Sequence, residues 1–309
     1  MKVCIHRGAN QIGGSCIELQ SGASRLVLDL GLPLDAKPGA PQPLPPVAGL
    51  AAGDDANLLG IVISHPHQDH WGLLPGVSPS VPVFIGEAAA SVLRAATFFG
   101  ASGMDLHPAG HLRHRQRFVL GPFAITPYLN DHSGYDAYAL LIEAEGRRLF
   151  YTGDFRGHGR KAALFEQLLA DPPGDIDVLL MEGTNLSQLD AEPKTVVTEK
   201  ALERNLIDVF RDAKGMVLIA FSAQNIDRLV TVYRAAVQAD RELVVDLYAA
   251  TIAEATGRES IPKPGFDKLR VFVPQSQGVR VKRAGAFHRT QAVKPCRIFP
   301  EEFRPRRSK

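Results

Sequence analysis

Residues 64–72 read SHPHQDHWG. Three histidines and an aspartate fall between His65 and His70, directly after the apolar run LLGIVI. Side chains two residues apart in extended backbone point the same way, so His65 and His67 could hold one metal ion. Asp69 and His70 come after a turn and could hold a second ion. Imidazole and carboxylate ligands without thiolate favour Zn²⁺, with Mn²⁺ or Fe²⁺ as alternatives.

Further ligands are expected at the ends of other predicted strands. His132 follows the strand FAITPYL, and Asp154 follows the apolar run LFY and a glycine. Asp29, in LVLDLG, ends a third strand, and a carboxylate there could orient the metal ligands from behind. A single histidine or aspartate at a strand end is more often a surface or turn residue. The dense motif at residues 65–70 strengthens the case for His132 and Asp154.

A second histidine-rich stretch, HPAGHLRHR, is predicted to be a solvent-exposed loop. Its histidines, His107, His111 and His114, have spacings that could line one helix face. Pro108 and Gly110 disfavour a helix there. No carboxylate follows nearby, so we do not predict a metal site in this stretch.

The composition is that of a globular protein, with 45% hydrophobic and 22% charged residues among 309. No apolar run reaches the roughly 18 residues of a membrane span, and the N-terminus lacks a signal-peptide core. We therefore expect a cytoplasmic protein without membrane association. Three cysteines without a CxxC pair argue against disulfides and thiolate zinc sites. Cys4 and Cys16 lie in apolar runs and are predicted to be core residues.

Two domains are predicted, residues 1–186 and 187–309. The first alternates short strands with glycine-rich turns, and chemically active residues gather at strand ends. This favours a layered α/β or α+β sandwich with a site on its rim. The second alternates helices and strands, which predicts a parallel sheet. Its predicted elements are a helix at 195–213, a strand at 216–221, a helix at 222–239 with Ser222 as its N-cap, a strand at 242–248, a helix at 251–258 and a strand at 269–274.

The net charge of +2 hides an asymmetry between the two ends of the chain. From Asp267 onward there are twelve Lys and Arg against three Asp and Glu, a net of +9, which leaves −7 on the first 266 residues. A basic end on an acidic body indicates contact with a polyanion. A solvated tail is the alternative, and charge alone does not separate the two.

The metal-type residues together resemble the metallo-β-lactamase superfamily in their order and spacing. The stretches MEGTNL and VLIAFSAQNIDRLVTVYRAA are similar to the start of the inserted domain in the β-CASP branch, which includes RNase J-type ribonucleases and the mRNA 3′-end-processing endonucleases. The resemblance covers about residues 3–290. It implies an αββα-type sandwich, its second half incomplete, with an inserted β-CASP α/β domain.

The resemblance also implies a dinuclear zinc site that hydrolyses RNA. By this resemblance, two ions would ionise water near neutral pH and stabilise an in-line displacement at phosphorus. By this resemblance Asp69 and Glu182 take catalytic roles, Glu182 as the acidic residue of the β-CASP set. The implied metal ligands are His65, His67 and His132 for the first zinc, Asp69 and His70 for the second, and Asp154 as the bridge, with Asp29 behind them.

The chain departs from the family after the inserted domain. The family carries two further histidines there, one that assists catalysis and one that completes the second zinc. Here His288 is the only histidine after His158, so the second zinc site would be incomplete and the chain resembles a C-terminally shortened member. A missing half-sandwich would expose a sheet edge and apolar surface. We therefore expect a homo-oligomer or a partner that covers it.

Two other positions could bind substrate phosphates. Arg156 lies with further cations just past Asp154, and Ser222 opens a predicted helix whose N-terminus could face a phosphate. A solvated loop and a helix cap are the alternatives. The leading prediction is a zinc-dependent ribonuclease. A metallo-hydrolase of small esters and a truncated, weakly active or non-catalytic metal- or RNA-binding relative remain open.

Overall fold

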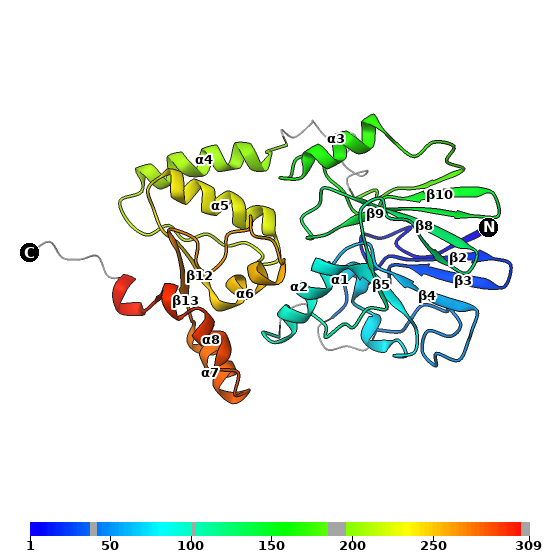
Figure 1. The fold of residues 1–309 in the computed structure, drawn as a ribbon, viewed down its shortest axis with the longest axis horizontal. Coiled ribbons are helices and arrows are strands. Elements are labelled where there is room, and N and C mark those ends of the chain that lie inside the picture. The colour runs from blue at the N-terminus through cyan, green and yellow to red at the C-terminus, as the bar shows by residue number, and fades with distance from the viewer. Residues whose placement is uncertain (38–41, 101–102, 185–195, 304–309) are drawn as a thin grey trace, which may run out of the picture. The chain divides into compact units, whose positions relative to one another are not determined.

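The computed structural model describes residues 1–37, 42–100, 103–184 and 196–303. The chain divides into two compact units, Met1–Leu93 with Met104–Val196 and Arg94–Gly103 with Val197–Lys309 (Figure 1). The predicted boundary between residues 186 and 187 lies outside the described residues.

The first unit contains two β-sheets. In the first sheet, strands pair in chain order. The first three strands are antiparallel, and the pairs from β3 to β6 are parallel. Its strands are β1 (Lys2–Arg7), β2 (Cys16–Ser21), β3 (Ser24–Leu28), β4 (Leu58–Val62), β5 (Val83–Gly86) and β6 (Gly110–Leu112).

The second sheet has the order β11-β10-β9-β8-β7. All of its pairs are antiparallel except β10 with β11, which is parallel. Its strands are β7 (Phe118–Leu120), β8 (Phe123–Leu129), β9 (Tyr138–Ala144), β10 (Arg147–Tyr151) and β11 (Val178–Leu180).

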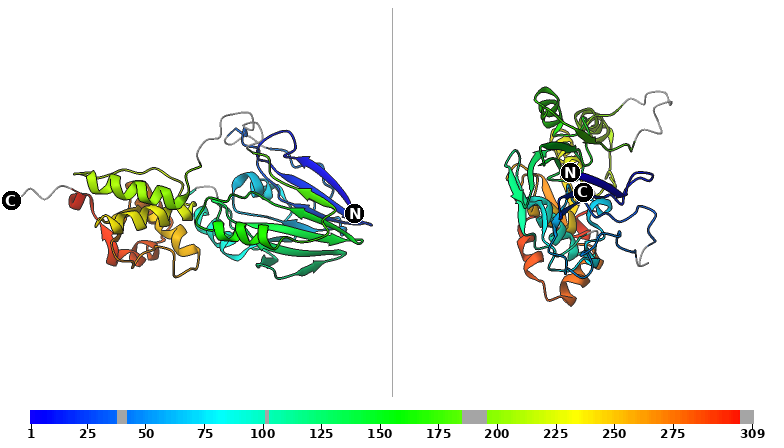
Figure 2. Two further views of the ribbon diagram at one scale, coloured as in Figure 1. Left: turned by 90° about the horizontal axis from the view of Figure 1, so that it is seen from above. Right: turned by 90° about the vertical axis from the view of Figure 1, so that its right-hand side faces the viewer.

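Four layers form around these sheets. Alternate residues of a strand face opposite sides, and one apolar cluster joins Leu26 and Leu28 of the first sheet to Phe123 and Leu140 of the second, which places the sheets face to face. Helices α1 (Gln68–Trp71) and α2 (Glu87–Thr97) cover the outer face of the first sheet. Helix α3 (Ala162–Ala170) covers that of the second (Figure 2). The predicted αββα sandwich is confirmed.

The second unit has a parallel sheet of three strands, as predicted. Apolar clusters join this sheet to its helices and join α4 to α5. The strands are β12 (Leu243–Asp246), β13 (Leu269–Phe272) and β14 (Arg297–Ile298), and the helices are α4 (Glu199–Asp212), α5 (Ile226–Gln238), α6 (Leu247–Ala255), α7 (Gln275–Arg283) and α8 (His288–Ala292).

Several predictions for the second unit are wrong. The apolar run 216–221 is not a strand; none of the strands described pairs with it, and Leu218 is 86% exposed. The N-cap of α5 is Asn225, whose side chain accepts a hydrogen bond from the Arg228 N–H, and not Ser222. The basic end of the chain forms α7, α8 and β14, where only one strand was expected.

Two predictions for the first unit also need correction. Cys4 is exposed, because β1 lies at the edge of its sheet and its first four residues face solvent. His111 is in strand β6 and not in a loop, because the buried Leu112 beside it anchors this strand against β5. None of the helices in the described part of the chain has the length and apolar character needed to cross a membrane.

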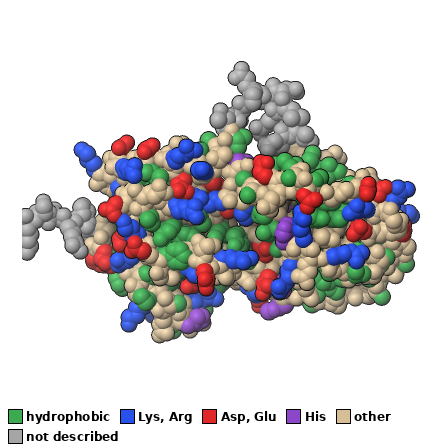
Figure 3. Space-filling view, turned by 45° about the horizontal axis from the view of Figure 1, so that its top comes forward, with side chains coloured by type: hydrophobic (Ala, Val, Ile, Leu, Met, Phe, Trp, Pro, Cys, Tyr) green, Lys and Arg blue, Asp and Glu red, His purple; other side chains and the backbone are tan. Residues whose placement is uncertain are grey.

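The terminal strand β11 and the residue after it carry exposed apolar side chains. Val178, Leu179 and Met181 are all exposed, and β11 ends its sheet among the residues that the structure describes. Apolar side chains also lie among charged ones on the molecular surface in Figure 3. An apolar sheet edge favours association; the expected homo-oligomer or covering partner stays a prediction.

The two cysteines of the first unit should differ sharply in reactivity. Burial, followed by the nearby Asp29 charge, raises the pKa of Cys16 to about 12, so its thiol stays protonated at neutral pH. Cys4 is exposed. We expect iodoacetamide to label Cys4 in the folded protein and to leave Cys16 unmodified, as peptide mass spectrometry would show. Labelling of Cys16 at a rate equal to Cys4 would contradict this burial.

Candidate metal centre

The predicted ligands gather at one rim of the sandwich because their strands end there. β3 and β4 are parallel neighbours, and Asp29 and His65 follow their carboxyl ends. β8 and β10 both run antiparallel to β9 and therefore point the same way, and they lead to His132 and Asp154. Residues from four strand ends thus meet.

Two groups of ligand atoms result. His65, His67 and His132 form one group, and His65, His70 and Asp154 form the other; within each group the ligand atoms lie within 4.8 Å of one another. His67 is extended and directly precedes α1, which carries His70. One loop therefore supplies both groups.

His65 provides the clearest sign of a metal site. Its side chain is fully buried, and its Nε2 has no hydrogen-bond partner. Ser64 Oγ lies 3.0 Å from the other ring nitrogen, Nδ1. A buried polar atom without a partner is costly, and a cation at Nε2 would satisfy it. Burial also lowers the pKa of His65 far below its usual value, which keeps the imidazole neutral and able to bind a metal.

His67 and His132 turn nitrogen atoms toward each other. His67 Nδ1 and His132 Nε2 are 3.0 Å apart. Burial lowers the pKa of His67, and burial together with the His67 charge lowers the pKa of His132 to about 3. Both rings therefore stay neutral at pH 7, the form of imidazole that binds a divalent metal.

Asp29 lies behind this cluster and is fully buried. Its carboxylate accepts hydrogen bonds from Ser64 N–H at 2.7 Å, Ser64 Oγ at 2.8 Å and Tyr151 OH at 2.6 Å. It also pairs with His70 Nδ1 at 2.7 Å. Burial and the Asp29 charge raise the pKa of Tyr151, so its phenol remains a donor. This network turns His70 Nε2 toward the cluster.

Sequence reasoning missed Ser64 and Tyr151. Each is a polar residue at the end of an apolar strand and close in sequence to a predicted ligand: Ser64 directly precedes His65, and Tyr151 lies three residues before Asp154. That signal is weak, because serine and tyrosine at strand ends are common in proteins.

Both ring nitrogens of His70 face carboxylates. Nδ1 meets Asp29, and Nε2 lies 3.3 Å from Asp154 Oδ1. Burial alone would lower the pKa of His70, but the Asp29 and Asp154 carboxylates outweigh it and raise the pKa well above the usual value. Burial would raise the pKa of Asp154, and its pairing with His70 lowers it instead. A metal ion at Nε2 would therefore displace a proton.

Asp69 lies at the margin of the cluster. Its Oδ2 is 3.8 Å from His70 Nε2, and it belongs to neither of the two groups. The backbone around it is held firmly, because Ser15 N–H donates to Asp69 O at 3.1 Å. Trp71 is buried and donates from Nε1 to Pro66 O at 2.9 Å, which secures the loop from behind.

Glu182 and Arg156 lie near the cluster without joining it. Glu182 Oε1 accepts the N–H of Phe155 at 3.0 Å, so it holds the backbone next to Asp154. Arg156 Nε lies 3.6 Å from the buried carboxylate of Asp131, which also accepts the Gly159 N–H at 2.7 Å. Sequence reasoning missed Asp131, which directly precedes His132.

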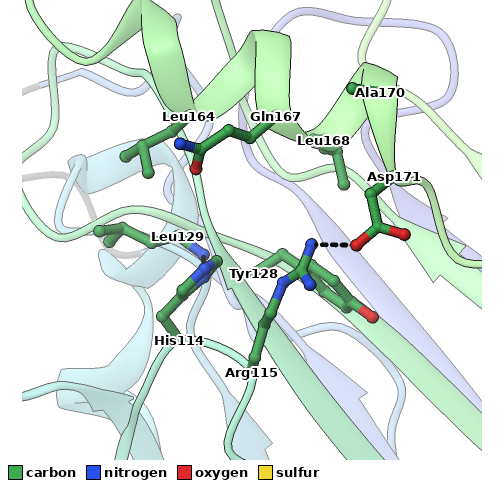
Figure 4. Close-up of a pocket in the computed structure, with 9 residues that line it drawn as sticks. All are labelled: His114, Arg115, Tyr128, Leu129, Leu164, Gln167, Leu168, Ala170 and Asp171. Carbon is green, nitrogen blue, oxygen red and sulfur yellow. Dashed lines mark hydrogen bonds and ion pairs between the residues drawn. The ribbon is translucent and has the colours of Figure 1, made fainter.

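The other predicted positions lie elsewhere. Ser222 is exposed and belongs to the second unit, so its contact with a substrate phosphate stays a prediction. His114 lines a cavity of about 420 Å³ between α3 and the end of β8. In Figure 4, Arg115 reaches across this cavity to Asp171, at 2.8 Å. None of the predicted metal ligands lines it.

The buried histidines predict how stability depends on pH when no metal is bound. His65, His67 and His132 have lowered pKa values in the folded protein and gain protons on unfolding below pH 6.5, so acid favours unfolding. His70 has the opposite effect because its pKa is raised in the folded protein. Its protonated form stabilises the fold fully below pH 6.5, and this stabilisation is lost as the pH rises through the folded pKa of His70. Each net proton changes stability by about 1.4 kcal/mol per pH unit.

We expect the chelated protein to be most stable near pH 6.5 and to lose stability steeply toward pH 5. Urea unfolding at pH 5, 6.5 and 8 would measure this. His132→Gln should reduce the acid slope by about one proton. An unchanged slope in this variant would contradict the assignment of a neutral, buried His132.

Comparison with known proteins identifies the family. Residues 33–217 match the β-lactamase superfamily domain. A ribonuclease J from Sinorhizobium meliloti is 28% identical over 71% of this chain, and an RNase J-like protein from Methanocaldococcus jannaschii is 25% identical over 66%. The chain spans only 39% and 46% of the lengths of these two relatives.

A solved structure supports the same fold. The crystal structure of a protein of unknown function from Enterococcus faecalis V583 superposes with a TM-score of 0.70 at 19% identity, and covers 96% of this chain and 86% of that one. At this identity the likeness concerns the fold alone. The family match extends over more than half of the chain and includes the histidine motif, His132 and Asp154. The chain therefore belongs to the β-lactamase superfamily, the superfamily of the metallo-β-lactamases.

Proposed function

We propose that this protein is a metal-dependent phosphodiesterase that cleaves RNA. The observation that carries the proposal is the pair of ligand groups that meet at His65, whose buried Nε2 has no hydrogen-bond partner. The similarity to ribonuclease J proteins supports RNA as the substrate. We further propose that the strand–helix unit after Glu182 corresponds to a β-CASP domain.

The residues present fit two divalent ions, which we propose to be zinc. His65, His67 and His132 would hold one ion, and Asp69, His70 and Asp154 would hold the other. Asp154 also faces the first group, because its Oδ2 lies 3.8 Å from His65 Nε2 and 3.9 Å from His132 Nε2. Bound ions would act as Lewis acids and ionise water near neutral pH.

The chain's own groups would orient the reacting atoms. Asp69 has a carboxylate that is 18% exposed and could accept a proton from attacking water. Arg156 and Lys161 would place positive charge near the substrate phosphate; Lys161 Nζ donates to His132 O at 3.1 Å, so its ammonium lies beside the cluster. Glu182 would act indirectly, through the Phe155 N–H that it holds next to Asp154.

The test is cleavage of a labelled single-stranded RNA by the full chain. We expect cleavage that a chelator abolishes and that added zinc or manganese restores. The same preparations should be assayed on p-nitrophenyl acetate and on bis(p-nitrophenyl) phosphate. Ester turnover without RNA cleavage would favour a small-ester hydrolase instead. Stoichiometric metal with no turnover on any of the three substrates would favour a non-catalytic relative.

A further inference from the structure

The second unit contains a long segment without acidic residues. Residues 268–300 carry eight Lys and Arg and no Asp or Glu, whereas residues 1–267 carry 23 Lys and Arg against 31 Asp and Glu. The segment includes α7 and α8. Positive charge is therefore concentrated on one folded part of an otherwise acidic chain.

Several of these basic residues flank the turn between α7 and α8. Ala286 N–H donates to Val281 O at 3.0 Å and Gly285 N–H to Lys282 O at 3.2 Å, which closes the end of α7. Gly285 has a φ of 62°, the left-handed conformation that such a turn needs. α8 begins at His288, so the last residues of α7 and the first of α8 flank the same turn.

Both helices are anchored to the body of the second unit. Arg280 Nη1 donates to Phe98 O at 3.1 Å, and the Arg289 guanidinium lies 4.2 Å from the Phe98 ring centroid. The buried Val281 and Val293 pack into the core of this unit. Rigid anchoring fixes the positions of the exposed side chains on α7 and α8.

The exposed side chains around this turn include cations and an aromatic ring. We define the α7–α8 surface as the exposed residues Lys282, Arg283, Phe287, His288 and Lys294. Among the residues described in this unit, ion pairs are made by Arg228, Lys268 and Arg270, and not by any cation of the α7–α8 surface. Phe287 is 54% exposed.

Helix stability explains only part of this arrangement. Cations in the last turn of a helix interact favourably with its dipole, which accounts for Lys282 and Arg283. It does not account for Lys294 or for the absence of acids from residue 268 to residue 300. It also gives no reason for an exposed phenyl ring beside the cations. Cations next to an exposed aromatic ring are typical of surfaces that bind single-stranded nucleic acid.

We propose that the α7–α8 surface binds single-stranded RNA, with the cations at backbone phosphates and a base stacked on Phe287. This inference rests on the proposed function, because it assumes RNA as the substrate. It adds a binding surface on the second unit that is separate in sequence from every proposed metal ligand. The surface would capture RNA without reading its sequence, since phosphates and base faces are common to all RNA.

The test is RNA binding by the full chain in the presence of chelator, measured by anisotropy of a labelled oligouridylate. Lys282→Gln with Arg283→Gln removes two charges. We expect roughly twentyfold weaker binding at 0.1 M salt. The slope of log K against log salt concentration should become shallower by about 1.4, because each phosphate contact on a single strand contributes about 0.7 to this slope. Phe287→Ala should weaken binding by about fivefold to a hundredfold with little change in salt dependence.

Matched controls separate a binding role from a folding role. Lys200→Gln with Arg204→Gln removes two exposed cations from α4, where acidic residues are interspersed, and should leave binding unchanged. Thermal unfolding should be similar in all variants. Hydrolysis of bis(p-nitrophenyl) phosphate with metal should also be preserved in the α7–α8 variants.

The outcomes distinguish this inference from the proposed function. Equal RNA affinity of the wild type and the α7–α8 variants would overturn the proposed RNA-binding role of this surface. It would leave the proposed function, RNA cleavage, unaffected. Weakened binding in the variants, with no RNA cleavage by any protein, would support the surface and count against the proposed function. Binding to phosphatidylserine vesicles with none to RNA would overturn the inference in favour of a lipid surface.

Discussion

The His67→Ala variant is expected to lose metal and at least a hundredfold in RNA cleavage. His67 Nδ1 lies 3.0 Å from His132 Nε2, so removing its ring takes one of three nitrogens from the first ligand group. The proposed reaction would need an ion to polarise the phosphate and ionise water, so loss of the ion should remove most of the rate enhancement. Metal content per chain, on protein purified without added metal, should fall together with activity.

Metal content of the wild type also tests the second ion. Near two equivalents would indicate that Asp69, His70 and Asp154 suffice for a second site, despite the histidines expected from the family. One equivalent would indicate an incomplete second site. His107→Ala is the matched control, because the His107 side chain is 81% exposed and belongs to neither ligand group. Full metal content in His67→Ala would contradict the site.

The Gly31→Ala variant is expected to lose about 3 kcal/mol or more of stability, at the upper end of the cost of overpacking. A Cβ on Gly31 would lie 1.6 Å from Asp69 O and 2.3 Å from the Asp69 carbonyl carbon. These are backbone atoms, and Ser15 N–H holds this carbonyl at 3.1 Å, so the loop cannot yield locally. Urea unfolding measures the loss, and metal content should fall because Asp69 and His70 move with the loop.

Gly174→Ala provides the control for Gly31→Ala. A Cβ on Gly174 would have nothing within 4 Å, so the change should alter stability by less than about 0.5 kcal/mol. If Gly31→Ala unfolds at the same urea concentration as Gly174→Ala and binds the same metal, the close packing of Gly31 against the loop is refuted.

Much of the first unit could be predicted because its signals are local. Short apolar strands between glycine-rich turns predicted a layered sandwich, and the motif at residues 65–70 marked the rim where His132 and Asp154 also lie. The roles of Ser64 and Tyr151 could not be predicted, because they depend on how strands distant in sequence meet at Asp29.

The errors in the second unit have a different cause. The run 216–221 is apolar enough for a buried strand, but strand formation depends on a partner, and none is found among the described strands. Helices α7 and α8 were missed because their amphipathic pattern is short and dominated by charge. Asn225 and not Ser222 caps α5, because helix boundaries depend on backbone geometry within a few residues.

The position of Trp71 has a consequence for how the protein folds. Trp71 is the only tryptophan in the chain, and its indole is fixed to Pro66 O inside the metal loop. The ligands come from strand ends between residues 65 and 154, so both sheets must pair before they converge, and such non-local contacts form slowly. During refolding, the fluorescence of Trp71 should therefore reach its final value before zinc binds tightly, or at the same time. A chelating dye that reports zinc uptake ahead of the Trp71 signal would contradict this order.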